Sequence, residues 1–191
     1  MGRIAALFIL SAASVFTGAG TPAPGRSTPS DEVRDDITST ITTSDEAEIG
    51  AVVDAMYASI SGPIGVPRDW QRFERAFTDA AQLIGYFSAP GEELVVRQWT
   101  PDVFREQIGP FLVETGVVET ETRRSIQHFG HIAHVFSTYR AVFTDGEATS
   151  VTGINSFQLI KTERGWKIQS LIWQQAGEVL PLPREYAAET D

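Results

Sequence analysis

The hydrophobic positions of this chain follow a helical period first and a strand period later. The first helical stripe lies between Thr43 and Gly62 and consists of Ile49, Val52, Val53, Met56, Tyr57 and Ile60. Residues three and four positions apart share one face of an α-helix, so this spacing predicts a helix with one buried side. Thr43 fits an N-cap with Glu46 as its capping-box partner, and Gly62-Pro63 ends the helix.

A second helix is expected to begin after Asp69, which is a suitable N-cap residue. Its stripe is strongly aromatic and consists of Trp70, Phe73, Phe77, Ala80 and Ala81. Residues 94–97 follow and are expected to form a short strand, because they are rich in β-branched side chains.

A third helix is expected to open at Thr100-Pro101, with proline in the first helical position, and to close at Gly116. Its apolar positions are Phe104, Ile108, Phe111 and Leu112. Pro110 is expected to kink or shorten this helix, because it lacks the backbone N–H that a helix interior needs.

After Gly116 the pattern changes to period 2, and β-branched and aromatic residues dominate. The predicted strands are residues 117–126, 130–143, 150–161 and 166–174. Short turns at Asp145-Gly146 and at residues 163–165 indicate an antiparallel meander. Helices followed by strands indicate an α+β fold. We therefore expect three helices packed on a curved antiparallel sheet of four or five strands.

Both faces of the second of these strands are apolar. Ala133, Val135 and Tyr139 point to one side, whereas Ile132, Phe136 and Val142 point to the other. A sheet with one face in water alternates more cleanly between apolar and polar residues. The simplest explanation is that helices cover one face and a second subunit covers part of the other, which predicts a homodimer formed through the sheet face.

At this point the sequence resembles a known superfamily. Residues 133–139 (AHVFSTY), residues 153–159 (GINSFQL) and the step Gly165-Trp166-Lys167-Ile168, followed by Trp173, carry the resemblance. They resemble the nuclear transport factor 2-like cone fold of ketosteroid isomerases, scytalone dehydratase and polyketide cyclase-like proteins. Residues 61–73 are also similar to a segment of secreted bacterial proteins of unassigned function.

The resemblance covers residues 44–176. It implies a cone-shaped α+β barrel with a conical pocket between the helices and the concave sheet. It implies no particular function, because the superfamily contains enzymes and plain binding domains alike.

Composition narrows the function classes. The 191 residues carry a formal net charge of −10, and the longest basic run is Arg123-Arg124. Nucleic-acid binding requires clustered Lys and Arg, so nucleic acid is not an expected partner. There is no cysteine, which excludes disulfides, thiolate metal sites, a Cys nucleophile and the lipid-anchored cysteine of a bacterial lipoprotein.

The first 19 residues have the pattern of a signal peptide. Arg3 supplies a positive charge, residues 4–16 are apolar or small, and residues 17–19 offer a cleavage site. Residues 20–43 are rich in Thr, Ser, Pro and Gly and are expected to be a disordered linker, and residues 177–191 a C-terminal tail. No other stretch is long enough to cross a membrane, so we expect a secreted or periplasmic protein.

Candidate ligand-binding residues come from the walls of the implied pocket. Aromatic side chains on the helix faces suit a small apolar ligand, and polar groups on central strands would orient it. These residues are Tyr57, Trp70, Phe73, Phe77, Trp99, Phe111, Ser137, Tyr139 and Asn155. Each also fits a purely structural role, the aromatic residues as core and the polar ones in internal hydrogen bonds.

The histidines and the absent motifs argue against a metal or cofactor. His128, His131 and His134 are spaced three apart, so on a strand they cannot converge on one ion. One of them could still face the pocket as a base. No phosphate-binding glycine loop, nucleophile elbow or zinc-protease motif occurs.

Three hypotheses follow. The first is a domain that binds a small, largely apolar molecule without catalysis. The second is an enzyme of the isomerase, dehydratase or cyclase type that uses Tyr57 or a histidine as acid or base. The third is a dimeric interaction module whose pocket is vestigial.

Overall fold

The structure is a computed structural model that describes residues 43–87, 93–144 and 149–187. The chain divides into residues 1–40 and residues 41–191, and all described residues belong to the second unit. The expected signal peptide and nearly all of the expected linker therefore lie outside the described residues. Within the described ranges, no helix is both long enough and apolar enough to cross a membrane.

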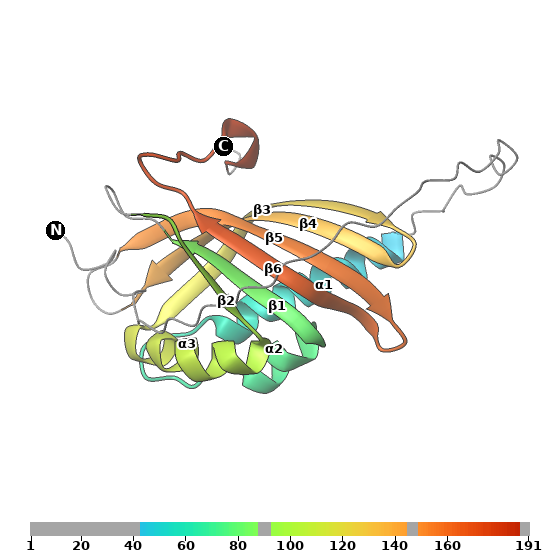
Figure 1. Cartoon of the computed structure of the whole chain (residues 1–191), viewed down its shortest axis with the longest axis horizontal. Coiled ribbons are helices and arrows are strands. Elements are labelled where there is room, and N and C mark those ends of the chain that lie inside the picture. The colour runs from blue at the N-terminus through green and yellow to red at the C-terminus, as the bar shows by residue number, and fades with distance from the viewer. Residues whose placement is uncertain (1–42, 88–92, 145–148, 188–191) are drawn as a thin grey trace, which may run out of the picture. The chain divides into compact units, whose positions relative to one another are not determined.

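Three helices and six strands make up the domain (Figure 1). The helices are α1 (Thr43–Ile60), α2 (Trp70–Ala76) and α3 (Pro101–Thr115). The strands are β1 (Phe77–Phe87), β2 (Val95–Trp99), β3 (Val117–Phe129), β4 (Ile132–Phe143), β5 (Ser150–Thr162) and β6 (Gly165–Gln175). A short 3-10 helix, η1 (Arg184–Tyr186), follows.

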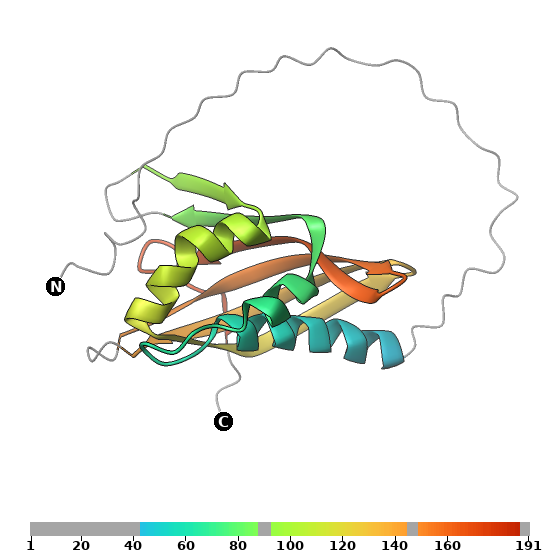
Figure 2. The same cartoon turned by 90° about the horizontal axis from the view of Figure 1, so that it is seen from below.

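The strands form one sheet in the order β2-β1-β6-β5-β4-β3. All neighbours are antiparallel except β1 and β6, which are parallel. The three helices lie on one side of this sheet (Figure 2), which we call the inner face. The expected α+β fold is thereby confirmed. The sheet has six strands and one parallel pair, and it is open, because its edge strands β2 and β3 do not pair with each other.

The predicted second helix extends further along the chain than the observed one. The structure ends α2 at Ala76 and begins strand β1 at Phe77, so the expected helical residues Phe77, Ala80 and Ala81 lie in a strand. The reason is visible in the burial of β1, where Ala81, Leu83 and Gly85 are buried and their neighbours are not. This period of 2 is set by pairing with β2 and β6, which overrides the local helical spacing.

The helix boundaries otherwise lie close to the expected ones. Helix α1 begins at Thr43 itself, one residue earlier than a cap at that position would give. Asp69 caps α2 as predicted, since its Oδ1 accepts a hydrogen bond from the Arg72 N–H at 2.9 Å. Helix α3 runs through Pro110 to Thr115, so the proline does not shorten it. It ends at Gly116, whose φ of 65° favours glycine.

Stacked aromatic rings form the core between the helices and the sheet. Phe73 of α2 stacks on Phe104 of α3, with ring centroids 5.5 Å apart. Trp99 of β2 stacks on Trp173 of β6 at 5.6 Å and meets Phe104 edge-on at 6.0 Å. These contacts hold α2 and α3 against the β2-β1-β6 end of the sheet.

The opposite side of the sheet, which we call the outer face, is partly covered by the chain's own C-terminal segment. The described part of the expected tail, residues 177–187, lies on this side of the sheet (Figure 1). Thr138 Oγ1 donates a hydrogen bond to the Tyr186 carbonyl at 2.6 Å, and the Tyr186 ring lies 5.0 Å from the Phe136 ring. Part of the apolar outer face predicted to bind a second subunit is therefore covered within one chain. The homodimer itself stays a prediction.

Candidate functional site

Three of the predicted polar residues meet on the inner face beneath α1. Ser137 of β4 and Asn155 of β5 are direct partners across the two strands, so their side chains point to the same side. The Tyr57 hydroxyl of α1 lies 2.6 Å from Ser137 Oγ and 2.9 Å from Asn155 Nδ2. All three side chains are buried. The structure brings these three residues together, and their expected role in ligand binding stays a prediction.

Two carboxylates of β3 complete this group, which we call the inner polar cluster. Asn155 Nδ2 donates to Glu119 Oε1 at 3.1 Å, and Ser137 Oγ donates to Glu121 Oε1 at 2.5 Å. Ser61, just after α1, fixes β3 at this point, because its hydroxyl bonds both the N–H and the carbonyl of Glu119. Neither glutamate was predicted. No local pattern marks them, because the contact that places Glu119 beside the end of α1 joins residues 58 positions apart.

The two glutamates differ in charge compensation. Arg124 donates from Nε to Glu121 at 2.9 Å and pairs through Nη2 with both Glu121 and Asp54 at 2.5 Å. Among the described residues, no cation pairs with Glu119. Burial therefore raises the pKa of Glu119 to about 7 from its ordinary 4.5, although the hydrogen bond from Asn155 opposes the shift.

The direction of every hydrogen bond in the cluster is fixed. The one proton of Ser137 goes to Glu121, so the Tyr57 hydroxyl must donate to Ser137 Oγ. The Asn155 amide uses its two protons on Tyr57 and Glu119. Tyr57 thus has no proton free for a ligand. Burial and the charge of Glu119 also raise its pKa above the ordinary value for tyrosine.

Tyr139 lies beside this cluster on the same face. Its hydroxyl would be only 2.6 Å from a β-carbon at Gly153, its partner across β4 and β5. Glycine at position 153 therefore makes room for the tyrosine. Burial, with a smaller contribution from Glu119, raises the pKa of Tyr139 above its ordinary value. Tyr139 is a buried neighbour of the cluster.

The predicted aromatic residues belong to the core. Phe73, Phe77 and Trp99 are almost completely buried, and Trp70 and Phe111 pack against them. They fill space between the helices and the sheet in which the resemblance implied a pocket. Trp99 also donates from Nε1 to Gln107 at 3.0 Å.

The histidines do not form a metal site. Among the residues that the structure describes, no group of three or more His, Asp or Glu side chains is arranged to hold an ion. His128 lies edge-on to Trp166, with ring centroids 6.5 Å apart, and His131 is exposed at the β3–β4 turn. His134 Nε2 lies 3.1 Å from Ser156 Oγ on the outer face.

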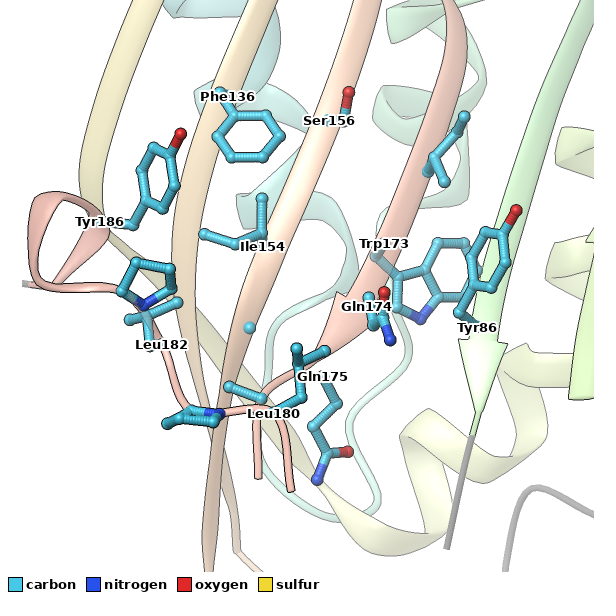
Figure 3. Close-up of a pocket in the computed structure, with 15 residues that line it drawn as sticks. Tyr86, Phe136, Ile154, Ser156, Trp173, Gln174, Gln175, Leu180, Leu182 and Tyr186 are labelled. Carbon is cyan, nitrogen blue, oxygen red and sulfur yellow. The ribbon is translucent and has the colours of Figure 1, made fainter. Parts of the chain in front are cut away.

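A groove of about 280 Å3 lies on the outer face (Figure 3). The sheet contributes Tyr86, Phe136, Ile154, Ser156, Ile172 and Gln174 to its walls. The C-terminal segment contributes Leu180, Pro181, Leu182, Pro183 and Tyr186. We call this space the outer groove. Its walls are mostly apolar, which suits an apolar ligand.

The C-terminal segment is attached near its two ends. At the start, the Ala176 N–H donates to the Thr152 carbonyl at 2.9 Å, and at the end Tyr186 is held by Thr138 and Phe136. The strands β4, β5 and β6 beneath this stretch already pair with a strand on each side, so it cannot join the sheet there, and Pro181 and Pro183 have no N–H to donate. The segment therefore stands off the strands and leaves the groove between its two attachments.

Sequence reasoning missed the outer groove. It treated residues 177–191 as a tail, because they have neither helical nor strand periodicity. The available signal was the apolar stretch Leu180-Pro181-Leu182, together with apolar outer-face positions that had no assigned partner.

Comparison with known proteins identifies the fold. No family model matches the chain, and no curated protein sequence matches it. Solved structures do match. A protein of unknown function with a cystatin-like fold from Nostoc punctiforme has a TM-score of 0.55 and 15% identity, covering 74% of this chain and 98% of its own. A nuclear transport factor 2-like protein of unknown function from Pseudomonas putida has a TM-score of 0.56 and 12% identity, covering 78% and 96%.

The description of a third similar structure names an activity. It is a protein from Streptomyces avermitilis described as a candidate dehydratase of the nuclear transport factor 2-like family. Its TM-score is 0.53 and its identity 16%, covering 70% of this chain and 97% of its own. At such identities the similarity establishes the fold and leaves the function open.

Proposed function

Starting from the nuclear transport factor 2-like fold that this chain has, we propose that the domain binds a small, largely apolar molecule in the outer groove. The observation that carries the proposal is the groove itself, with its apolar walls and partly exposed side chains. Its volume of about 280 Å3 lies near the lower end of small-molecule pockets, which begin at about 300 Å3. The proposed ligand class is the one expected from the sequence. The proposed binding site lies on the outer face of the sheet, whereas the expected pocket lay between the helices and the sheet.

The inner face is a less suitable place for a ligand, because the protein's own side chains already fill it. The aromatic core occupies one part, and the inner polar cluster pairs its own hydrogen-bonding groups in another. A ligand there would have to displace packed rings or break buried hydrogen bonds, and each broken bond would cost about 1–3 kcal/mol. The outer groove requires neither.

The test uses naphthalene as an apolar probe and follows its fluorescence during titration with the protein. Ile154→Trp fills the groove and is expected to abolish binding. Ile160→Trp is the matched control, because Ile160 also lies on the outer face of β5 but does not line the groove. Equal binding by both variants, or no binding by the wild-type protein, would refute the proposal.

Acid–base chemistry at Glu119 is a second candidate function. It is favoured by the position of Glu119, whose carboxyl accepts from the same Asn155 amide that bonds Tyr57, and by its raised pKa of about 7. Because the Tyr57 hydroxyl donates its proton to Ser137, Glu119 is a better candidate than Tyr57 for the acid of an isomerase, dehydratase or cyclase. Carboxyl 13C NMR tests this candidate with Glu119→Gln for assignment. If the Glu119 carboxyl titrates near pH 4.5, its ordinary value, this second candidate function is wrong.

We also propose that the protein is exported to the periplasm or secreted. The support is the sequence pattern of residues 1–19, with one positive charge followed by an apolar stretch. Expression of the full chain in a Gram-negative bacterium, fractionation and N-terminal sequencing test the proposal. A soluble periplasmic or secreted form that begins near residue 20 is expected. Cytoplasmic protein with an intact N-terminus would contradict it.

A further inference from the structure

The polar side chains of the mostly apolar outer groove include Ser156 on the sheet, together with Gln174, Gln175, Tyr86 and Tyr186. Ser156 lies opposite Phe136 of β4 (Figure 3) and opposite Ile172 of β6, so two groove residues flank it on the outer face. Among the described residues, its one side-chain hydrogen bond joins its Oγ to His134 Nε2 at 3.1 Å. A serine hydroxyl has one donor and two acceptor positions, so hydrogen-bonding capacity is left over in the groove.

His134 holds this hydroxyl in place. Its ring is partly buried and lies 5.8 Å from the Phe136 ring, which restricts its orientation. Neutral imidazole accepts at Nε2 in one tautomer and donates there in the other. Ser156 can therefore either accept from a ligand or donate to it. A ligand group that does both, such as a hydroxyl, is matched by either arrangement.

The groove also limits the size and the shape of a ligand. An apolar cavity of about 150 Å3 holds one benzene molecule, so about 280 Å3 corresponds to two fused rings. Ile154 and Ile172 on neighbouring strands line the space. Figure 3 shows the Phe136 and Tyr186 rings, which are 5.0 Å apart, at one end of it. Aromatic side chains with aliphatic neighbours favour contact with flat aromatic surfaces.

We infer that Ser156, positioned by His134, is the polar recognition point of the outer groove, and that the ligand is a two-ring aromatic molecule with a hydroxyl group. This inference rests on the proposed function, since it assigns a ligand class to the same groove. Ser156 contacts the ligand directly, whereas His134 is a positioning residue.

The Ser–His pair is assigned to binding and not to nucleophilic catalysis. Catalysis by a serine needs donors that stabilise an oxyanion beside it. Strand β5 pairs with β4 on one side and β6 on the other, so the backbone N–H groups around Ser156 are used within the sheet. The arrangement orients a hydroxyl group and leaves its bonds intact.

The experiment compares naphthalene with 2-naphthol, which differ by one hydroxyl. The wild-type protein is expected to bind 2-naphthol more tightly. Ser156→Ala should lower 2-naphthol affinity roughly two- to tenfold and leave naphthalene affinity unchanged, because one hydrogen bond is lost. Ser150→Ala is the matched control, since Ser150 lies on the same face of β5 and does not line the groove. It should change neither affinity.

Two variants of His134 test its positioning role. His134→Gln keeps a hydrogen-bonding group near the Nε2 position and should retain the preference for 2-naphthol. His134→Leu removes that group and should reduce the preference, with naphthalene affinity unchanged. Thermal melts of every variant show whether the domain stays folded.

The outcomes separate the two claims. If both probes bind, Ile154→Trp abolishes binding and Ser156→Ala affects both probes equally or neither, the assignment of Ser156 is wrong and the groove proposal survives. If His134→Leu leaves the preference intact, the positioning role of His134 is wrong. If the wild-type protein binds neither probe, the proposed function fails and this inference fails with it.

Discussion

The two faces of the sheet use the same strands for opposite purposes. On β4 and β5, the inward residues Ser137 and Asn155 join a buried cluster in which the protein's own groups take up the hydrogen bonds. Their neighbours Phe136 and Ser156 point outward into a groove whose side chains are only partly covered. Because side chains alternate along a strand, one residue step separates a group that is sealed from one that is available to a ligand.

This contrast shows that buried polar residues do not by themselves mark a binding site. The inner polar cluster has the composition of an active site, with a tyrosine and two carboxylates, one of which pairs with Arg124. Each donor of the cluster nevertheless bonds an acceptor of the protein itself, so none of these protons is left for a ligand. The side chains of the outer groove are mostly apolar, but they are partly exposed, so a ligand can reach them.

The largest expected difference between the faces concerns apolar truncation. Phe157→Ala removes a fully buried inner-face ring that meets Tyr57 edge-on at 6.2 Å, and should lower the free energy of unfolding by about 3–5 kcal/mol. Ile160→Ala, on the outer face of the same strand, should lower it by less. Urea unfolding measures both changes. A similar loss for both would mean that the two faces are equally packed.

A second difference concerns polar side chains that are neighbours in sequence. Asn155→Leu leaves the hydroxyl of Tyr57 and the carboxyl of Glu119 without their partner, and should cost about 2–4 kcal/mol. Ser156→Ala should cost less than about 1 kcal/mol, because its hydroxyl faces the groove. Denaturant melts of the two variants check this. Equal costs would contradict a sealed cluster beside an open groove.

The raised pKa of Glu119 gives the inner polar cluster a pH dependence. The folded protein binds the Glu119 proton more tightly than the unfolded chain, so this carboxyl lowers stability as pH rises from about 4.5 to about 7. Glu119→Gln should match the wild-type protein at pH 4 and exceed it at pH 8 by about 1–3 kcal/mol. Unfolding free energies at these two pH values measure the difference. A constant difference at all pH values would show that Glu119 titrates normally.

A modest loss of stability is expected when the C-terminal segment is removed. A chain that ends at Ala176 loses one hydrogen bond from Thr138 and one ring contact of Tyr186, so its unfolding free energy should fall by only about 1–2 kcal/mol. Naphthalene binding should be lost, because the segment forms one wall of the groove. Circular dichroism melts and probe titration are the measurements. A truncated chain that still binds would place the site elsewhere.

Much of the fold could be predicted from sequence because its signals are local. Asp69 capped its helix as expected, and the strands after Gly116 fall close to their predicted limits. Strand β1 was missed because Trp70, Phe73 and Phe77 keep helical spacing across the point where the helix becomes a strand. Only the pairing of Leu83 and its neighbours with β2 and β6 decides that segment, and pairing over such a sequence distance leaves no local pattern.

The candidate sites could be predicted only in part, for a similar reason. Tyr57, Ser137 and Asn155 stood out as polar residues in buried elements, and they do meet. Glu119 and Glu121 look like ordinary exposed strand residues until the end of α1 covers them. The outer groove depends on where residues 177–187 lie against the sheet, and an aperiodic segment rich in proline carries no information about its docking position.

The choice between the two faces is tested best by isoleucine methyl NMR during titration with naphthalene. Ile154 and Ile172 line the outer groove, whereas Ile49 and Ile168 are fully buried on the inner side and Ile160 lies on the outer face away from the groove. The expected result is a saturable shift of the Ile154 and Ile172 methyl signals, with the other three unchanged. Shifts of Ile49 or Ile168 instead would place the ligand between the helices and the sheet and contradict the outer groove as the binding site.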